Sequence, residues 1–208
     1  GWAAGQFGTI LRTADGGTSW DSTAYFTGVD FTDLFFINDK IGWVCDRSGR
    51  VYSSKDSGVS WTDMTLNIEK PLLSLEFYNI ASGVVVGAGG NVAVTFNAGL
   101  EWFPKQYDTS VTFNSIDLRQ PFLGWIVGEK GRMYKTTNGG GIWNPFATGQ
   151  IQDVHSITRL SSGNFLAVGN GGLIVRSSNE GLTWDSIYSG TTTKLTAVDF
   201  HNGVRSEE

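Results

Sequence analysis

One motif returns five times along the chain at a constant interval of 41 residues. Its first copy is TADGGTSW, and the tryptophans that end the copies keep this spacing without insertion or deletion. The motif positions are Asp15, Gly17 and Trp20; Asp56, Gly58 and Trp61; Asn97, Gly99 and Trp102; Asn138, Gly140 and Trp143; and Asn179, Gly181 and Trp184. Such a fixed period indicates a fold built from repeated supersecondary units.

Each repeat has the pattern of four short strands. In the second repeat we expect strands at 33–37 (DLFFI), 42–46 (GWVCD) and 50–54 (RVYSS), and a fourth that starts at Trp61. No segment has the apolar periodicity of an amphipathic helix, which a helical repeat of similar length would need. The sequence therefore predicts an all-β fold, a β-propeller of five four-stranded blades that occupies residues 1–208 as a single domain.

The two ends of the sequence carry complementary parts of a repeat. The chain starts within a second strand (GWAAG) and finishes just after a first strand, LTAVDF at 195–200. We expect the C-terminal strand to join the N-terminal blade and close the ring in a monomer, which removes exposed strand edges. Two alternatives remain open: the chain forms five blades of a larger ring in a longer protein, or another copy completes the ring.

The motif itself is predicted to be a structural turn between the third and fourth strands. Its Asp or Asn side chain accepts hydrogen bonds from backbone amides, and its glycines permit positive φ. The Trp then buries a large ring against the sheet. Three of the five copies carry Asn at the Asp position. A hydrogen-bonding turn tolerates this exchange, whereas a catalytic acid would not.

The pattern S/T-x-D/N-x-G-x-x-W is identified as the Asp-box, or BNR repeat. The segments GWAAGQFGTILRTADGGTSW (1–20) and GWIVGEKGRMYKTTNGGGIW (124–143) resemble the propeller family that includes the photosystem II stability and assembly factor. The resemblance covers essentially the whole chain. It implies a non-enzymatic module that binds a protein partner. Propellers of this appearance also occur as modules of secreted bacterial proteins.

Charge and composition exclude several classes of protein. The net charge of −5 and the pI near 5.0 do not fit a nucleic-acid-binding surface. No apolar run has the length of a membrane span, and the single cysteine, Cys45, allows no intramolecular disulfide. We expect an exported protein (extracellular, periplasmic or thylakoid-lumen-like) whose signal lies outside this sequence.

One column of the repeat places acidic residues on the predicted innermost strands. It contains Glu76, Asp117 and Asp199, together with Phe35 and Thr158. Three carboxylates there suit a cation or a cationic group in the central channel. The alternative is a solvated channel wall or polar contacts between blades. No cofactor or metal is expected, because His155 and His201 are too few for a metal site.

A second candidate site is basic. Arg47, Arg50, Lys130 and Arg132 follow the second strands of two repeats and are expected on adjoining loops of one face. In the family that the chain resembles, an arginine-rich face is thought to contact the partner. The alternative is ordinary surface charge.

Two other functions are compatible with an Asp-box propeller. One is a sialidase, since Asp-boxes also occur in sialidases, where they lie away from the catalytic centre. The strict 41-residue period leaves no blade with an inserted catalytic loop, so we assign no catalytic residues. A glycan-binding lectin would use exposed aromatics between blades, with Phe7, Phe26 and Tyr107 as candidates.

Overall fold

The computed structural model describes residues 1–64, 66, 68–118, 122–161 and 163–200. Over these residues the strands form five antiparallel sheets, each built from strands that are consecutive in the sequence. From the inside outward the sheets are β1 (Trp2–Ala4), β2 (Thr9–Arg12) and β3 (Asp21–Tyr25); β4 (Phe31–Phe36), β5 (Gly42–Asp46), β6 (Val51–Ser54) and β7 (Thr62–Asp63); β8 (Leu72–Phe77), β9 (Gly83–Gly87), β10 (Asn91–Thr95) and β11 (Phe103–Gln106); β12 (Phe113–Asp117), β13 (Gly124–Gly128), β14 (Met133–Thr136) and β15 (Asn144–Phe146); and β16 (Val154–Ser161), β17 (Asn164–Gly169), β18 (Ile174–Ser177) and β19 (Asp185–Ser186).

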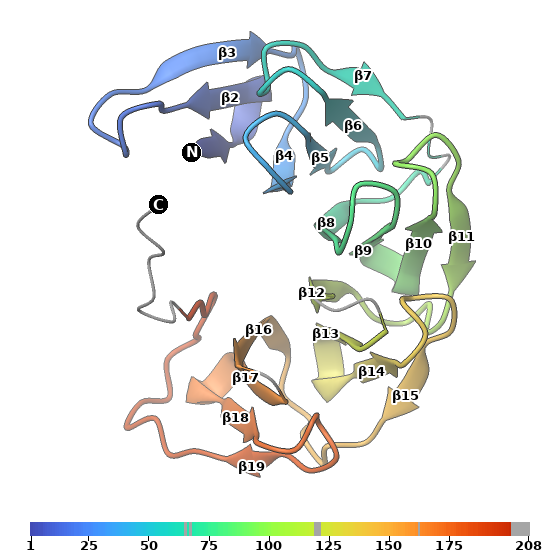
Figure 1. Cartoon of the computed structure of the whole chain (residues 1–208). Coiled ribbons are helices and arrows are strands. Elements are labelled where there is room, and N and C mark those ends of the chain that lie inside the picture. Colours follow the sequence, from blue (N-terminus) through green and yellow to red (C-terminus); the bar gives the residue numbers. More distant parts are fainter. Residues whose placement is uncertain (65, 67, 119–121, 162, 201–208) are drawn as a thin grey trace.

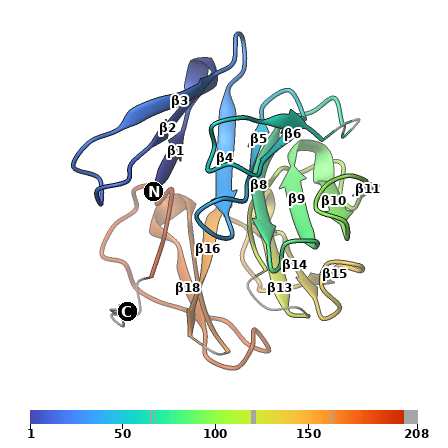
Figure 2. The ribbon, with the colours of Figure 1, turned by 45° about the horizontal axis from the view of Figure 1, so that its top comes forward.

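The five sheets, which we call the first to fifth blades, follow one another around an arc (Figure 1). Strands β4, β8 and β16 stand near the centre of the molecule (Figure 2). In four blades a single 3₁₀ turn joins the two strands that correspond to the second and third strands of the repeat (β1 and β2 in the first blade): η1 (Gln6–Gly8), η2 (Ala88–Gly90), η3 (Glu129–Gly131) and η4 (Asn170–Gly172). Within the described ranges, no helix has the length and apolar character needed to cross a membrane.

The predicted all-β blade is confirmed, with small shifts at the strand ends. The expected strand at 33–37 is β4 (Phe31–Phe36), the one at 42–46 is β5, and the one at 50–54 is β6 (Val51–Ser54). The outer strand starts one residue after the motif tryptophan, at Thr62 in the second blade. Period and turn chemistry locate strands well, but ladder hydrogen bonds determine their ends.

The predicted closure of the ring is not confirmed. Among the described residues the first sheet has three strands, with β1 paired only to β2, and the first and fifth blades lie at the two ends of the arc (Figure 1). Residues 195–200 contact the fifth blade instead. There the amide of Leu195 donates to the carbonyl of Gly169 at 3.0 Å, and the amide of Val198 donates to Ser156 Oγ at 3.2 Å.

The core consists of layers of side chains between neighbouring blades. Trp43 of the second blade is fully buried and stacks on Phe77 of the third, with ring centroids 3.6 Å apart. Trp102 packs edge-on against the same Phe77 ring at 6.1 Å. Each blade therefore depends on its neighbour for burial, as expected for repeats that cannot form a core alone.

Candidate functional site

The five Asp-box turns share one hydrogen-bond pattern. In the first copy, Thr13 Oγ1 lies 2.7 Å from Asp15 Oδ1, and the amide of Gly17 donates to Thr13 Oγ1 at 2.9 Å. The amide of Ser19 donates to Asp15 Oδ1 at 2.9 Å. In the Asn-containing copies the corresponding amides of Glu101, Ile142 and Thr183 donate to the Asn Oδ1 at 2.9, 2.9 and 3.0 Å. The turn therefore uses an oxygen that Asp and Asn both provide.

The second to fifth Asp-boxes also pack against the preceding blade. Trp2 Nε1 donates to the carbonyl of Ser57 at 2.9 Å, and Trp43 Nε1 donates to the carbonyl of Ala98 at 3.1 Å. A Cβ at Gly181 would overlap the Trp125 ring. Trp143 is 2% exposed, whereas Trp20, whose blade has no preceding blade in the arc, is 44% exposed. The motif thus joins blades as well as shaping a turn.

Two of the three predicted channel carboxylates join neighbouring innermost strands. Glu76 Oε2 accepts a hydrogen bond from the amide of Leu118 at 2.6 Å, and Asp117 Oδ2 accepts one from the amide of Arg159 at 2.9 Å. Glu76 and Asp117 are 7% and 2% exposed. Asp199 is exposed and bonds the amide of Phe200 next to it. The contacts of Glu76 and Asp117 therefore favour polar contacts between blades over the predicted cation site in the channel.

A third carboxylate in the same layer, that of the partly buried Asp33, was not among the predicted site residues. Asp33 Oδ2 accepts from the amide of Leu75 and Oδ1 from the amide of Leu34, both at 2.8 Å. Burial raises the pKa of Asp33, and these amides oppose that shift. Serine occupies its column in the next three repeats, so no repeated acidic pattern marked it. Asp33, Glu76 and Asp117 all line a central cavity of about 390 Å³.

The described residues contain no cluster of three or more His, Cys, Asp or Glu side chains suited to a metal ion. His155 Nε2 lies 2.8 Å from Asn170 Oδ1, while His201 lies outside the described residues. Cys45 is completely buried, and burial raises the pKa of its thiol.

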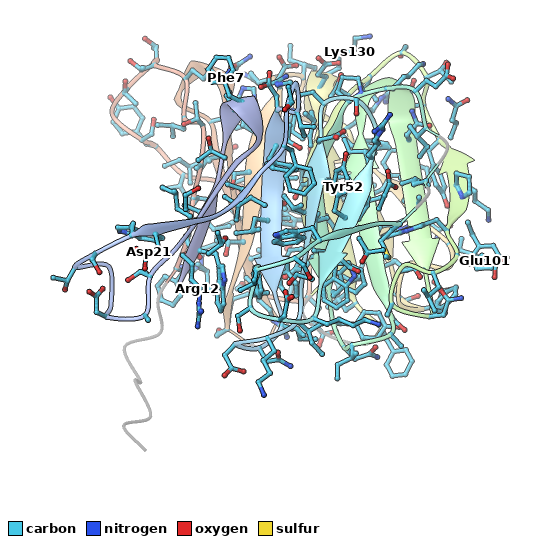
Figure 3. The ribbon with its side chains drawn as sticks, turned by 90° about the horizontal axis from the view of Figure 1, so that it is seen from above. Phe7, Arg12, Asp21, Tyr52, Glu101 and Lys130 are labelled. Carbon is cyan, nitrogen blue, oxygen red and sulfur yellow. The ribbon has the colours of Figure 1, made fainter. Side chains whose placement is uncertain are left out.

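The predicted basic residues lie on the turns between second and third strands. Phe7 in η1 and Lys130 in η3 stand at the same edge of the molecule, and Arg12 lies toward the opposite edge (Figure 3). Because the turns are equivalent in every blade, Arg47 and Arg50 share the face of Lys130. In the second blade Asp46 holds the turn, with its Oδ1 accepting from the amide of Arg50 at 3.0 Å.

The two cations of the fourth blade contact the third blade. Arg132 Nε lies 3.2 Å from Asp108 Oδ2, and Lys130 Nζ donates to the carbonyl of Ser110 at 2.9 Å. Hydrogen bonds from Ser110, and to a lesser degree the charge of Arg132, lower the pKa of Asp108. Arg132 remains 55% exposed.

The sequence missed Lys70, which lies between the two predicted basic pairs. They belong to the second and fourth blades, so they are not on adjoining turns. Lys70 covers the turn of the third blade, where a Cβ at Gly89 would meet its side chain. We call the set Arg47, Arg50, Lys70, Lys130 and Arg132 the basic arc. No repeated pattern marks Lys70, because it precedes an innermost strand instead of lying in the repeated turn.

The three aromatic candidates have different environments. Phe7 is 71% exposed at the tip of η1. Phe26 belongs to the core, with its ring centroid 5.4 Å from that of Phe31 and 5.1 Å from that of Tyr52. Tyr107 lines a pocket between the third and fourth blades, and its hydroxyl accepts from the amide of Trp143 at 3.4 Å.

Comparisons with known proteins agree with this architecture. The model of the family described as "Photosynthesis system II assembly factor YCF48" matches residues 53–204. The solved structure "YCF48 bound to D1 peptide" has a TM-score of 0.68 and 17% identity, covering 89% of this chain and 62% of that chain. YCF48 from Cyanidioschyzon merolae has a TM-score of 0.72 and 15% identity, covering 94% and 71%. An ancestral GH74 enzyme has a TM-score of 0.78 and 17% identity, covering 92% and 30%.

These likenesses differ in what they establish. At such identities the solved structures show the fold alone, and this chain spans less than two thirds of the first of them, at 62%. No curated protein matches the chain. The fold is shared by YCF48 and by GH74 enzymes, so function must be argued from the surfaces described above.

Proposed function

Because the chain belongs to the family described as photosynthesis system II assembly factor YCF48, we propose that it is a non-enzymatic module that binds a protein partner. The proposal includes export of the protein and action as a monomer. A related structure holds YCF48 with a D1 peptide. By analogy, the ligand here is an extended segment of another protein.

The observation that carries this proposal is the basic arc. The chain is acidic overall, with a net charge of −5, yet five of its 15 Lys and Arg residues belong to this arc on one face. Long-range attraction steers an oppositely charged partner toward such a surface. The arc therefore favours an acidic segment as ligand.

The channel carboxylates support the non-enzymatic part of the proposal. Glycoside hydrolysis ordinarily needs two carboxyl groups free to act on the substrate. Asp33, Glu76 and Asp117 instead accept hydrogen bonds from backbone amides of the neighbouring innermost strands. Turnover of xyloglucan or of a fluorogenic glycoside that disappears in Asp117→Asn would contradict this part.

The binding proposal is tested with tiled peptides from D1 and charge-matched scrambled peptides, by biolayer interferometry at two salt concentrations. We expect an acidic peptide to bind more weakly at high salt and to lose about tenfold or more in affinity in the variant Arg47→Glu/Lys130→Glu. The control variant Lys40→Glu/Lys55→Glu changes the net charge equally with exposed lysines outside the arc. Equal losses in both variants would mean that net charge, and not the arc, governs binding.

A further inference from the structure

The outer wall of the third blade departs from the repeat in a way that the fold does not require. Phe96 and Phe103 are 51% and 49% exposed, and their ring centroids lie 6.2 Å apart. In the other repeats the Phe96 position holds Ala14, Lys55, Thr137 and Ser178, and the Phe103 position holds Asp21, Thr62, Asn144 and Asp185. Four blades therefore form the same wall without an aromatic pair, which indicates a role outside folding.

A pocket of about 130 Å³ lies beside this pair. Val92 and Val94 of β10 and Tyr107 line it from the third blade, and Gly140 and Gly141 of the next Asp-box line it from the fourth. We call it the aromatic pocket. A glycine at the position of Gly141 is found only in the fourth blade, because the same position holds Thr18, Val59, Leu100 or Leu182 in the other repeats. Two independent departures from the repeat thus meet at one pocket.

The size and lining of the aromatic pocket indicate a single apolar side chain as occupant. Its volume is well below the ~300–1,000 Å³ of small-molecule sites. The Tyr107 hydroxyl already accepts from the amide of Trp143, and the remaining side chains of the described lining are aliphatic or aromatic apart from Lys105. A sugar would need several directed polar groups. A Phe or Leu side chain needs only apolar contact and fits the exposed aromatic pair.

The charge of Lys105 indicates which kind of residue lies next to the apolar side chain in the ligand. Lys105 lines the aromatic pocket and also a second cavity of about 510 Å³, whose lining includes Glu69, Lys70 and Asn91. Lys70 belongs to the basic arc. Two lysines against one carboxylate favour an acidic neighbour for the apolar side chain, and they connect the pocket with the arc.

We propose that the aromatic pocket holds an apolar side chain of the partner's acidic segment, whose adjacent Asp or Glu pairs with Lys105. The inference rests on the proposed function, because it assumes a protein ligand that also contacts the basic arc. The arc attracts the segment, and the pocket selects its sequence. Apolar anchors in desolvated pockets dominate the affinity of such interfaces, whereas exposed charges mainly affect association rates.

The test uses a fluorescein-labelled peptide, Gly-Ser-Glu-Glu-Phe-Glu-Glu-Ser-Gly, and the same peptide with Ala in place of Phe, measured by fluorescence anisotropy. We expect the Phe peptide to bind the unmodified protein about tenfold more tightly. This preference should fall to about twofold or less in Phe103→Asn and in Gly141→Leu, both of which use residues found in other blades. The controls are Tyr188→Asn, which removes a 94% exposed aromatic elsewhere, and Val59→Leu, at the position of Gly141 in the second blade.

Four outcomes would overturn the inference, and they separate it from the proposed function. If both peptides bind equally and both lose binding in Arg47→Glu/Lys130→Glu, the pocket does not hold the apolar side chain, and the basic arc alone is the binding face. Binding of neither peptide contradicts both proposals. Binding of a xyloglucan oligosaccharide that Phe103→Asn abolishes assigns the pocket to glycans. A preference that survives in both pocket variants, with melting temperatures unchanged, would also show that the anchor binds elsewhere.

Discussion

Asp117 of the fourth blade accepts a hydrogen bond at its Oδ2 atom from the backbone amide of Arg159 in the fifth, at 2.9 Å. Glu76 forms the corresponding contact with Leu118 one blade earlier, and Asp33 forms a related contact with Leu75. Innermost strands of neighbouring blades do not share a ladder, so part of their backbone needs other partners. These three carboxylates meet that need along the inner surface of the arc.

Removal of the Asp117 carboxylate should destabilise the protein. Asp117→Ala leaves the amide of Arg159 without this acceptor at a position only 2% exposed, which we expect to cost about 1–3 kcal/mol in the free energy of unfolding. Asp117→Asn keeps an acceptor oxygen and should cost less. Urea denaturation measures both. The exposed Asp199→Ala is the control, with a change within about 0.5 kcal/mol, and a loss in Asp117→Ala no larger than this would contradict the structural role.

The Asp-box aspartates should give the protein acid sensitivity. Hydrogen bonds, chiefly from Ser19 to Asp15 and from Ser60 to Asp56, lower the pKa of both carboxyls below the ordinary value of 3.8. Their stabilising contribution is therefore present above about pH 3.8 and is lost as the pH falls through the lowered values.

This pH dependence is measured by differential scanning calorimetry across the acid range. We expect the melting temperature of Asp15→Asn/Asp56→Asn to fall less steeply below about pH 4 than that of the unmodified protein. Asn already occupies the same position in three boxes, so the variant should fold. Asp39→Asn, at an exposed position, is the control. Identical slopes for the double variant and the unmodified protein would show that the turns do not favour the charged form.

The contact between an Asp-box and its preceding blade can be tested with a pair of glycines. Gly181 has φ +74° and Gly16 has φ +72°, so alanine is strained to a similar degree at both. Only at Gly181 would the new Cβ overlap a side chain, the Trp125 ring, whereas nothing lies within 4 Å at Gly16.

We expect Gly16→Ala to cost about 1 kcal/mol from backbone strain and Gly181→Ala about 2–4 kcal/mol from strain plus overpacking. Thermal and urea unfolding compare the two variants directly. Equal costs would mean that the fourth and fifth blades do not depend on this close approach.

The open joint of the arc is tested by cross-linking. In the second blade Leu34 of β4 pairs with Val44 of β5, and the repeat places Val198 and Ala3 at the same two positions. If the ring closes, Ala3→Cys/Val198→Cys in a Cys45→Ala background should form an intramolecular disulfide on oxidation.

Non-reducing electrophoresis and mass spectrometry distinguish the outcomes of this experiment. A cross-link within one chain supports the closed five-bladed monomer. A cross-link between two chains shows that a second copy completes the blade, and free thiols in both positions argue against either joint. Ala3→Cys/Asp63→Cys, which pairs β1 with an outer strand of the second blade, is the negative control.

The repeat predicted the blades, the strand positions and the turn geometry because each depends on local contacts. The Asp-box hydrogen bonds join residues two to four apart in the chain, so the sequence motif alone predicts their pattern. The role of Glu76 and Asp117 could not be predicted from their column in the repeat, because the amides that they bind belong to the neighbouring blade. The places of Asp33 and Lys70 could not be predicted, because each is the only charged residue of its kind at its position in the repeat and so forms no repeated pattern.

The kind of fold follows from local sequence alone, because a 41-residue period with short strand-forming segments and glycine-rich turns leaves few alternatives to a propeller blade. The contacts between blades, in contrast, are visible only in the folded molecule. The fold joins Asp117 to Arg159, places Lys70 between Arg50 and Lys130, and opens the aromatic pocket at Gly141. Contacts between blades join residues about one repeat apart in the chain, so their identity depends on long-range packing and not on a local sequence pattern.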